Sequence, residues 1–313
     1  MMVMTYRKTH KFLLLLLALL VIAASGVPTL AASPRKAQKS FASPEDAVKG
    51  LVAAVRSKNV KEAAAILGPG SRAIISSGDP VADRSGRELF LKLYDEKNAI
   101  SGAESGKAVL SIGNEDYPFP IPVVKKGGAW RFDSIAGKEE LLNRRIGRNE
   151  LEVIDVLRAY VDAQRDYAAM ERDGNGFAQK IRSTPGKKDG LYWEAKEGEE
   201  ESPFGPMAAK AAREGYARPK SGNPSPFHGY LFRILKAQGK NAEGGAFDYV
   251  VNGKMILGFA AIAWPAQYGA SGIMTFIVNQ NGIVYQKDLG KNTGKTAAAM
   301  KLYDPDRSWK KVE

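Results

Sequence analysis

The chain contains no cysteine, and this absence limits both the folds and the sites available to it. No disulfide can form, no thiolate can act as a nucleophile, and no zinc or iron–sulfur centre can have cysteine ligands. Buried apolar side chains must therefore hold the fold together. With 313 residues, the chain is long enough for one large domain or two ordinary ones.

The N-terminus has the three parts of a secretory signal peptide. Basic residues come first (Arg7, Lys8 and Lys11), and the apolar run 12–24 follows. This run is shorter than the roughly 18 residues that a membrane span needs, and small residues around Ala31 suit a signal peptidase. We predict a signal peptide over residues 1–31 and a flexible polar linker over residues 32–40. The alternative is an uncleaved membrane anchor.

No later segment is long and apolar enough to span a bilayer. We therefore expect a periplasmic or extracellular protein with no membrane span after cleavage.

The charge balance bears on the partners that the chain can have. The net charge is +12, from 46 basic and 34 acidic residues, and loss of the three basic residues of the signal leaves +9. Basic and acidic residues are interleaved and no nucleic-acid motif accompanies them, so we expect no nucleic-acid partner. An anionic envelope polymer or an envelope protein is the expected partner.

Residues 41–137 predict a first domain in which helices precede strands. Ser43 and Pro44 are typical of a helix N-terminus. Apolar periodicity predicts helices over residues 43–55, 60–67 and 84–96, and strands over residues 108–112, 119–124 and 129–132. Because Pro120 and Pro122 cannot donate backbone hydrogen bonds, residues 119–124 are expected at a sheet edge.

Residues 138–313 predict a second domain with the same order. A helical segment over residues 138–170 is expected to break at Gly147, and residues 184–226 to form an irregular excursion with a short helix at 207–214. Strands are predicted over residues 230–235, 255–264, 273–278 and 283–286, with a hairpin turn at Asn281 and Gly282. The sequence therefore predicts an α+β fold of two domains, each with helices followed by an antiparallel sheet.

Few residues could support catalysis or metal binding. His228 is the only histidine left after cleavage, and Ser271 lacks the spacing of a nucleophile elbow. We predict that His228 is structural, with no catalytic residue and no cofactor. The turn holding Asp173 and Asn175 has the alternating oxygens of a calcium loop but no terminal glutamate. These two residues are the metal candidates of the sequence.

An aromatic set in the excursion is the best candidate for a binding site. Such side chains either line a carbohydrate or peptide groove or fix a long loop onto its domain. The set, with the neighbouring histidine, is Tyr192, Trp193, Phe204, Tyr216, Phe227 and His228.

Each half of the chain resembles a known fold. Residues 41–133 resemble the nuclear-transport-factor-2-like cone, in the helix capped by Ser43 and in the closing strand 128–132. Residues 151–290 resemble a pilin or pseudopilin headgroup, in the stretches 159–168, 226–234 and 271–278. A prepilin peptidase site is absent from the start of the chain, so we expect no filament assembly.

Two further stretches carry a resemblance that covers nearly all of the mature chain. They are residues 180–193 (KIRSTPGKKDGLYW) and residues 244–253 (GGAFDYVVNG). Through them the chain is identified as a member of the exported bacterial family known as domain of unknown function 2950, a resemblance that implies no particular activity.

Three functions are compatible with these observations. The first is a non-enzymatic binding or scaffolding module of the cell envelope. The second is a hydrolase of envelope polymers, which would need two facing carboxylates. The third is a binder of small apolar ligands through the N-terminal cone. The sequence leaves the oligomeric state open.

Overall fold

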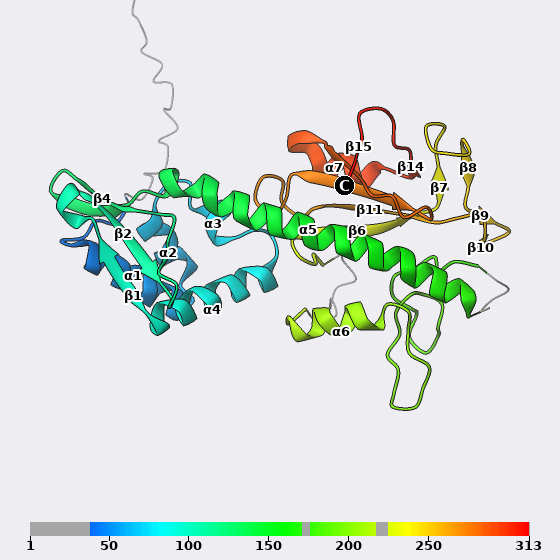
Figure 1. Cartoon of the computed structure of the whole chain (residues 1–313), viewed down its shortest axis with the longest axis horizontal. Helices are drawn as coiled ribbons and strands as arrows, with labels where there is room; N and C mark the ends of the chain where they lie inside the picture. Colours follow the sequence, from blue (N-terminus) through cyan, green and yellow to red (C-terminus); the bar gives the residue numbers. More distant parts are fainter. Residues whose placement is uncertain (1–37, 171–175, 217–224, 313) are drawn as a thin grey trace, which may run out of the picture. The chain divides into compact units, whose positions relative to one another are not determined.

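The computed structural model describes residues 38–170, 176–216 and 225–312. The predicted signal peptide and most of the predicted linker lie outside these ranges, as do Asp173 and Asn175, so those expectations stay predictions. Within the described ranges, helices followed by mainly antiparallel strands occur twice along the chain (Figure 1), which confirms the predicted α+β class.

The first half combines four helices with one sheet. The helices are α1 (Pro44–Arg56), α2 (Val60–Leu67), α3 (Arg72–Ile75) and α4 (Pro80–Glu96). The sheet has the order β1-β2-β4-β5, with β3 paired to β2, and its strands are β1 (Asn98–Ser101), β2 (Lys107–Ile112), β3 (Tyr117–Pro118), β4 (Val123–Lys126) and β5 (Ala129–Phe132). The predicted cap of α1 is confirmed, since the Ser43 hydroxyl accepts a hydrogen bond from Asp46 N at 3.0 Å.

Two boundaries in this half differ from the predictions. Helix α4 begins at Pro80 rather than at residue 84, because the Asp79 carboxylate accepts hydrogen bonds from Val81 N and Ala82 N. The predicted edge strand at 119–124 was wrong: the strand is β4, which lies between β2 and β5. Pro120 and Pro122 precede β4, so neither removes a donor from the ladder.

Helix α5 (Ser134–Ala169) links the two halves as one continuous helix (Figure 1). The predicted break at Gly147 was wrong. A mid-helix glycine costs only about 1 kcal/mol relative to alanine, and α5 buries side chains on both sides of Gly147, including Leu142, Ile146 and Val153. Packing on both sides therefore outweighs the local preference.

The second half is built on a five-stranded antiparallel sheet with the order β15-β13-β12-β11-β6. Its strands are β6 (Tyr230–Leu235), β11 (Ala260–Pro265), β12 (Met274–Asn279), β13 (Tyr285–Asp288) and β15 (Lys310–Lys311). The smaller elements are α6 (Gly205–Arg213), α7 (Thr293–Ala299), β7 (Ala237–Gln238), β8 (Phe247–Asp248), β9 (Val250–Val251), β10 (Lys254–Met255) and β14 (Leu302–Tyr303). The predicted strand 255–264 is thus two strands, β10 and β11.

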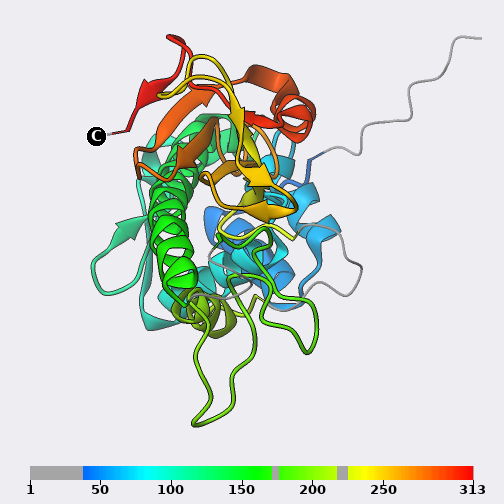
Figure 2. The same ribbon diagram turned by 90° about the vertical axis from the view of Figure 1, so that its right-hand side faces the viewer.

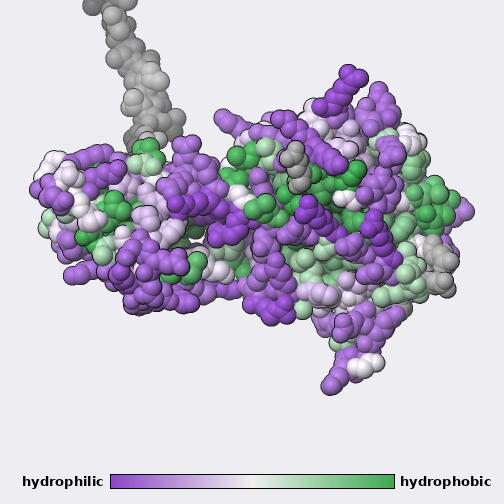
Figure 3. All heavy atoms as spheres, in the orientation of Figure 1, coloured by the Kyte–Doolittle hydropathy of each residue, from purple (hydrophilic) through white to green (hydrophobic). Residues whose placement is uncertain are grey.

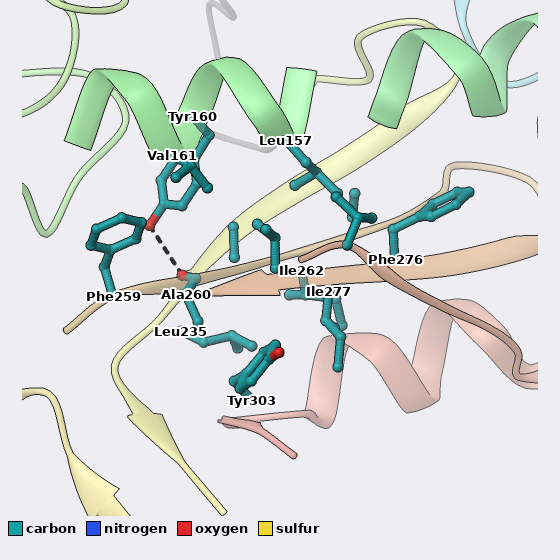
Figure 4. Packing of buried hydrophobic residues seen from close by; sticks show 14 of the residues in the cluster. Leu157, Tyr160, Val161, Leu235, Phe259, Ala260, Ile262, Phe276, Ile277 and Tyr303 are labelled. Atoms are coloured by element: carbon teal, nitrogen blue, oxygen red, sulfur yellow. Dashed lines mark hydrogen bonds between the residues drawn. The ribbon is translucent and has the colours of Figure 1, made fainter. Parts of the chain in front are cut away.

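The second core lies on both faces of this sheet. Figure 4 shows Leu157, Tyr160 and Val161 of α5 packed against one face, and Tyr303 beyond the other. The Tyr160 hydroxyl donates to Ala260 O at 3.1 Å. Because α5 and the α7–β14 region both contact β11, all six residues of that strand are buried. Burial on both faces explains its unbroken apolar sequence.

The two hydrophobic cores are separate sets of residues, yet residues 37–313 form one compact unit. The division at residues 137 and 138 therefore stays a prediction. Among the described residues, no helix combines the length and the apolar character needed to cross a bilayer.

Candidate functional site

A loop between residues 180 and 200 forms a hollow of about 390 Å³. Its two sides are held together by backbone hydrogen bonds, from Tyr192 N to Ile181 O and from Ser183 N to Tyr192 O, both at 2.8 Å. Only glycine fits at position 190, because a Cβ there would lie 2.7 Å from the carbonyl carbon of Arg182. The backbone conformation around the hollow is therefore fixed by these hydrogen bonds and by the close approach at Gly190.

Asp189 fixes the turn that closes the hollow. Its carboxylate accepts hydrogen bonds from Thr184 N at 2.7 Å, from the Thr184 hydroxyl at 2.9 Å and from Lys180 Nζ at 2.7 Å. The hydrogen bond from Lys180, followed by those from Thr184, lowers the pKa of Asp189 well below its usual range. This carboxylate thus holds the turn in place. Its oxygens accept hydrogen bonds from Lys180 and Thr184 rather than from a ligand.

Cations and aromatic rings line the hollow together. They are Arg182, Lys187, Lys188, Tyr192 and Trp193. The Arg182 guanidinium lies 4.7 Å from the centre of the Tyr192 ring, and Lys188 Nζ lies 5.3 Å from the centre of the Trp193 ring. These cation–π contacts orient the two charges toward the aromatic side of the hollow.

The charges of the hollow are only partly neutralised. Lys188 pairs with Glu200 at 3.1 Å, whereas Arg182 and Lys187 form no ion pair within the described part of the chain. Glu194 and Glu199 also line the hollow, so the lining carries both signs. The arrangement can bind a ligand with anionic groups and a flat face, and the two acids would reject a polyanion of the highest charge density.

A second polar cluster surrounds His228. Its Nε2 lies 3.2 Å from Glu214 Oε2 and 3.6 Å from Glu152 Oε2, but neither contact has hydrogen-bond geometry. Lys210 of α6 donates to Glu152 of α5 at 2.6 Å. The hydrogen bond from Lys210 is the main cause of the lowered pKa of Glu152.

The His228 side chain is 14% exposed and sits among aromatic rings. Its ring centre lies 4.1 Å from that of Phe227 and 5.8 Å from that of Tyr216. Burial is the main influence on the imidazole and lowers its pKa, while Glu214 and Glu152 act in the opposite direction. The backbone of His228 has a positive φ of 48°, which places the residue in a tight turn before β6.

Asp79 connects this cluster to the first half of the chain. Its buried carboxylate accepts hydrogen bonds from the Tyr216 hydroxyl and from Gly229 N, both at 2.8 Å. The Tyr216 hydroxyl in turn accepts from His228 N at 3.1 Å. The turn at residues 228 and 229 is thereby tied to the start of α4.

The geometry favours a structural role for this cluster. The Ser271 hydroxyl exchanges hydrogen bonds with the backbone of Gln267, accepting from N at 3.0 Å and donating to O at 3.1 Å. Its bonds are therefore made within its own loop rather than with His228. In the ranges that the structure describes, no group of three or more histidine, aspartate or glutamate residues could hold a metal ion.

The structure does not bring the predicted aromatic residues together in one site. Tyr192 and Trp193 line the hollow, whereas Tyr216, Phe227 and His228 pack together. Phe204 packs against the second core and its N donates to Leu191 O at 2.9 Å. The cations of the hollow were not predicted as site residues, although Arg182, Lys187 and Lys188 closely precede Tyr192 and Trp193 in the sequence.

The family described as a protein of unknown function, DUF2950, matches residues 38–312. The chain belongs to the DUF2950 family. The match spans both cores, the hollow and the His228 cluster, so DUF2950 covers the whole described fold.

No curated protein and no solved structure matches the chain. The resemblances to a nuclear-transport-factor-2-like cone and to a pilin headgroup are therefore still predictions for this DUF2950 member.

Proposed function

We propose that the chain is an exported, non-enzymatic binding module of the cell envelope, and that the hollow at residues 180–200 binds an anionic polymer. The observation that carries this proposal is the pair of cations without a carboxylate partner in the described residues, Arg182 and Lys187, beside Tyr192 and Trp193.

The chemistry of these side chains suits sugar acids. A guanidinium stacked on a ring keeps its planar N–H donors available for a carboxylate. Tyr192, which is half-buried, supplies apolar surface for the flat face of a sugar ring, whereas Trp193 is only 7% exposed and supports the hollow from the second core. Glu194 and Glu199 suit hydroxyl groups of the same sugars, which favours a polyuronate over a polyphosphate.

Binding can be tested with fluorescent alginate, a linear polyuronate, and with neutral dextran of the same length as a control ligand. We expect alginate to bind, and the affinity to fall as salt rises. Replacing both Arg182 and Lys187 with alanine should weaken binding by about tenfold or more, if each lost charge-assisted contact is worth about 1 kcal/mol.

The matched control replaces Lys295 and Arg307 with alanine. Both are exposed and removed from the hollow in sequence, and the control removes the same charge. An equal loss of alginate affinity in the two double variants would mean that the affinity depends only on the net charge of the chain. The hollow would then be rejected as the binding site.

Export is part of the proposal and has its own test. It is supported by the basic start, the apolar run 12–24 and the small residues near Ala31. Protein recovered from an envelope or culture fraction should begin at Ala32 when its N-terminus is sequenced. A chain that keeps its first residues would favour a membrane anchor.

The hydrolase is the second candidate function, and one observation favours it. Glu152 and Glu214 both face the imidazole of His228, and paired carboxylates can serve as acid and base. Release of reducing ends from envelope polysaccharide, abolished in Glu214→Gln, would establish this activity. Binding without release would support the module.

A further inference from the structure

A hairpin at the end of the second half carries apolar side chains that face solvent. Strands β9 and β10 are joined by Asn252 and Gly253, with positive φ values of 50° and 79°. Two successive left-handed residues make the tight turn that suits a two-residue hairpin. Its base is fixed, because Tyr249 and Met255 are 0% and 1% exposed and Phe177 N donates to Met255 O at 2.7 Å.

Three apolar side chains of this hairpin and the residues after it face solvent. Val251, Ile256 and Leu257 are 37%, 42% and 52% exposed. Figure 3 shows apolar surface where Figure 1 labels β9 and β10, and Figure 2 views the molecule from this side. Single exposed apolar residues are ordinary, but three on a hairpin and the segment directly after it indicate a contact surface.

Basic side chains accompany this apolar group. Lys254 follows the turn directly and is exposed. Gln179 joins the turn to a second lysine, since its amide donates to Gly253 O at 2.7 Å and its carbonyl accepts from Lys236 Nζ at 2.9 Å. Among the described residues no carboxylate forms an ion pair with either lysine, and Lys236 uses only one of its three N–H donors on Gln179.

We propose that the apolar tip, defined as Val251, Ile256 and Leu257, inserts into the headgroup region of an anionic bilayer while Lys236 and Lys254 contact the lipid phosphates. Apolar burial and attraction to an anionic surface add together at such an interface. A stable protein interface buries about 800 Å² from each partner, far more than three half-exposed side chains on a projecting turn. Insertion into a bilayer requires neither a buried area of that size nor a surface of complementary shape.

The apolar tip and its two lysines share no residue with the hollow at residues 180–200, and a bilayer is a different ligand from alginate. Residues 32–313, which include every described residue, would be sedimented with vesicles of phosphatidylglycerol and phosphatidylethanolamine. Vesicles of phosphatidylcholine alone are the neutral control. We expect binding to the anionic vesicles, weakened by high salt.

The test variant is Ile256→Ser with Leu257→Ser, and the matched control is Leu302→Ser with Leu89→Ser, whose side chains are 43% and 50% exposed. We expect the test variant to bind at least about tenfold more weakly and the control to bind as the unchanged chain does. A tryptophan introduced as Leu257→Trp should also be quenched by brominated lipid.

Three results would overturn the inference. One is absence of binding to anionic vesicles, and another is equal binding by the test and control variants. The third is a self-associating chain that becomes monomeric only in the test variant, which would make the tip a contact between copies.

Discussion

At the scale of single residues, the hydroxyl of Tyr216 has an unusual position. It donates to the buried Asp79 carboxylate at 2.8 Å and accepts from His228 N at 3.1 Å. Hydrogen bonds to charged groups contribute about 1.5–3 kcal/mol, so Tyr216→Phe should lower the free energy of unfolding by about that amount. Urea unfolding followed by circular dichroism measures the change.

Tyr94→Phe is the control for this prediction, because the Tyr94 hydroxyl makes no hydrogen bond within the described residues and the ring is half-buried. That variant should differ from the unchanged chain by less than about 0.5 kcal/mol. Similar decreases in the free energy of unfolding in both variants would contradict a stabilising role of the Asp79–Tyr216 hydrogen bond.

His228 predicts a pH dependence of stability. Burial lowers the pKa of the folded imidazole below its unfolded value of about 6.5, so the unfolded chain binds more protons as pH falls. Stability should therefore be fully present above about pH 7 and fall as pH drops below about 6.5 toward the folded pKa. Urea unfolding at pH values of about 7.5, 6.5 and 5.5 tests this dependence.

His228→Asn is the comparison, since asparagine tolerates a positive φ and does not titrate. The variant should be less stable at about pH 7.5, because it loses the contacts with Phe227 and Tyr216, but its stability should change less over the same pH range. An unchanged or steeper pH dependence in His228→Asn would assign the effect to another titrating group.

At the scale of elements, α5 owes its continuity to packing rather than to local preference. Gly147 lies in its interior and is exposed, and a Cβ added there would meet no atom within 4 Å. Gly147→Ala should therefore raise the free energy of unfolding by about 0.5–1 kcal/mol. Thermal unfolding provides the measurement.

Gly137 gives the opposite expectation in the same helix. A Cβ there would lie 2.3 Å from Pro120 O and 2.7 Å from Ile121 Cα, so the backbone would have to move. Gly137→Ala should destabilise the fold by more than Gly147→Ala stabilises it. If both substitutions had the same sign, the contrast between a crowded and an open glycine site would be refuted.

At the scale of the whole molecule, hydrogen bonds connect the two hydrophobic cores through Asp79 and Arg145. Asp79 precedes α4 and accepts from Gly229 N at 2.8 Å, while Arg145 of α5 donates to Ala73 O at 2.7 Å and to Ala270 O at 3.5 Å. We expect one heat-absorption peak in scanning calorimetry of the unchanged chain. Asp79→Ala should broaden or split that peak, because it uncouples the cores.

Asn59→Ala is the matched control, since Asn59, like Asp79, caps a helix of the first half, and the hydrogen bond that its side chain accepts comes from Glu62 N of the same half at 3.0 Å. It should lower the melting temperature and leave a single peak. Two peaks in the unchanged chain would contradict the coupling and would support two independently folding domains.

The sequence by itself determined the order of the elements and the family. Apolar periodicity, the cap at Ser43 and the turn residues act over a few neighbours along the chain, so helices α1 and α2 and the strands β2, β5 and β6 could be predicted closely. The same local information indicated the aromatic residues of the hollow and the absence of cysteine chemistry.

Tertiary structure decided what depends on residues far apart in the sequence. The break at Gly147 did not occur because α5 packs on both sides of it, and β4 became an internal strand because β2 and β5 flank it. The grouping of Arg182 with Tyr192, and of Asp79 with Tyr216 and Gly229, depends on how loops return to one another. Local propensity carries no information about such contacts, because their free energy arises only when the distant segments pack together.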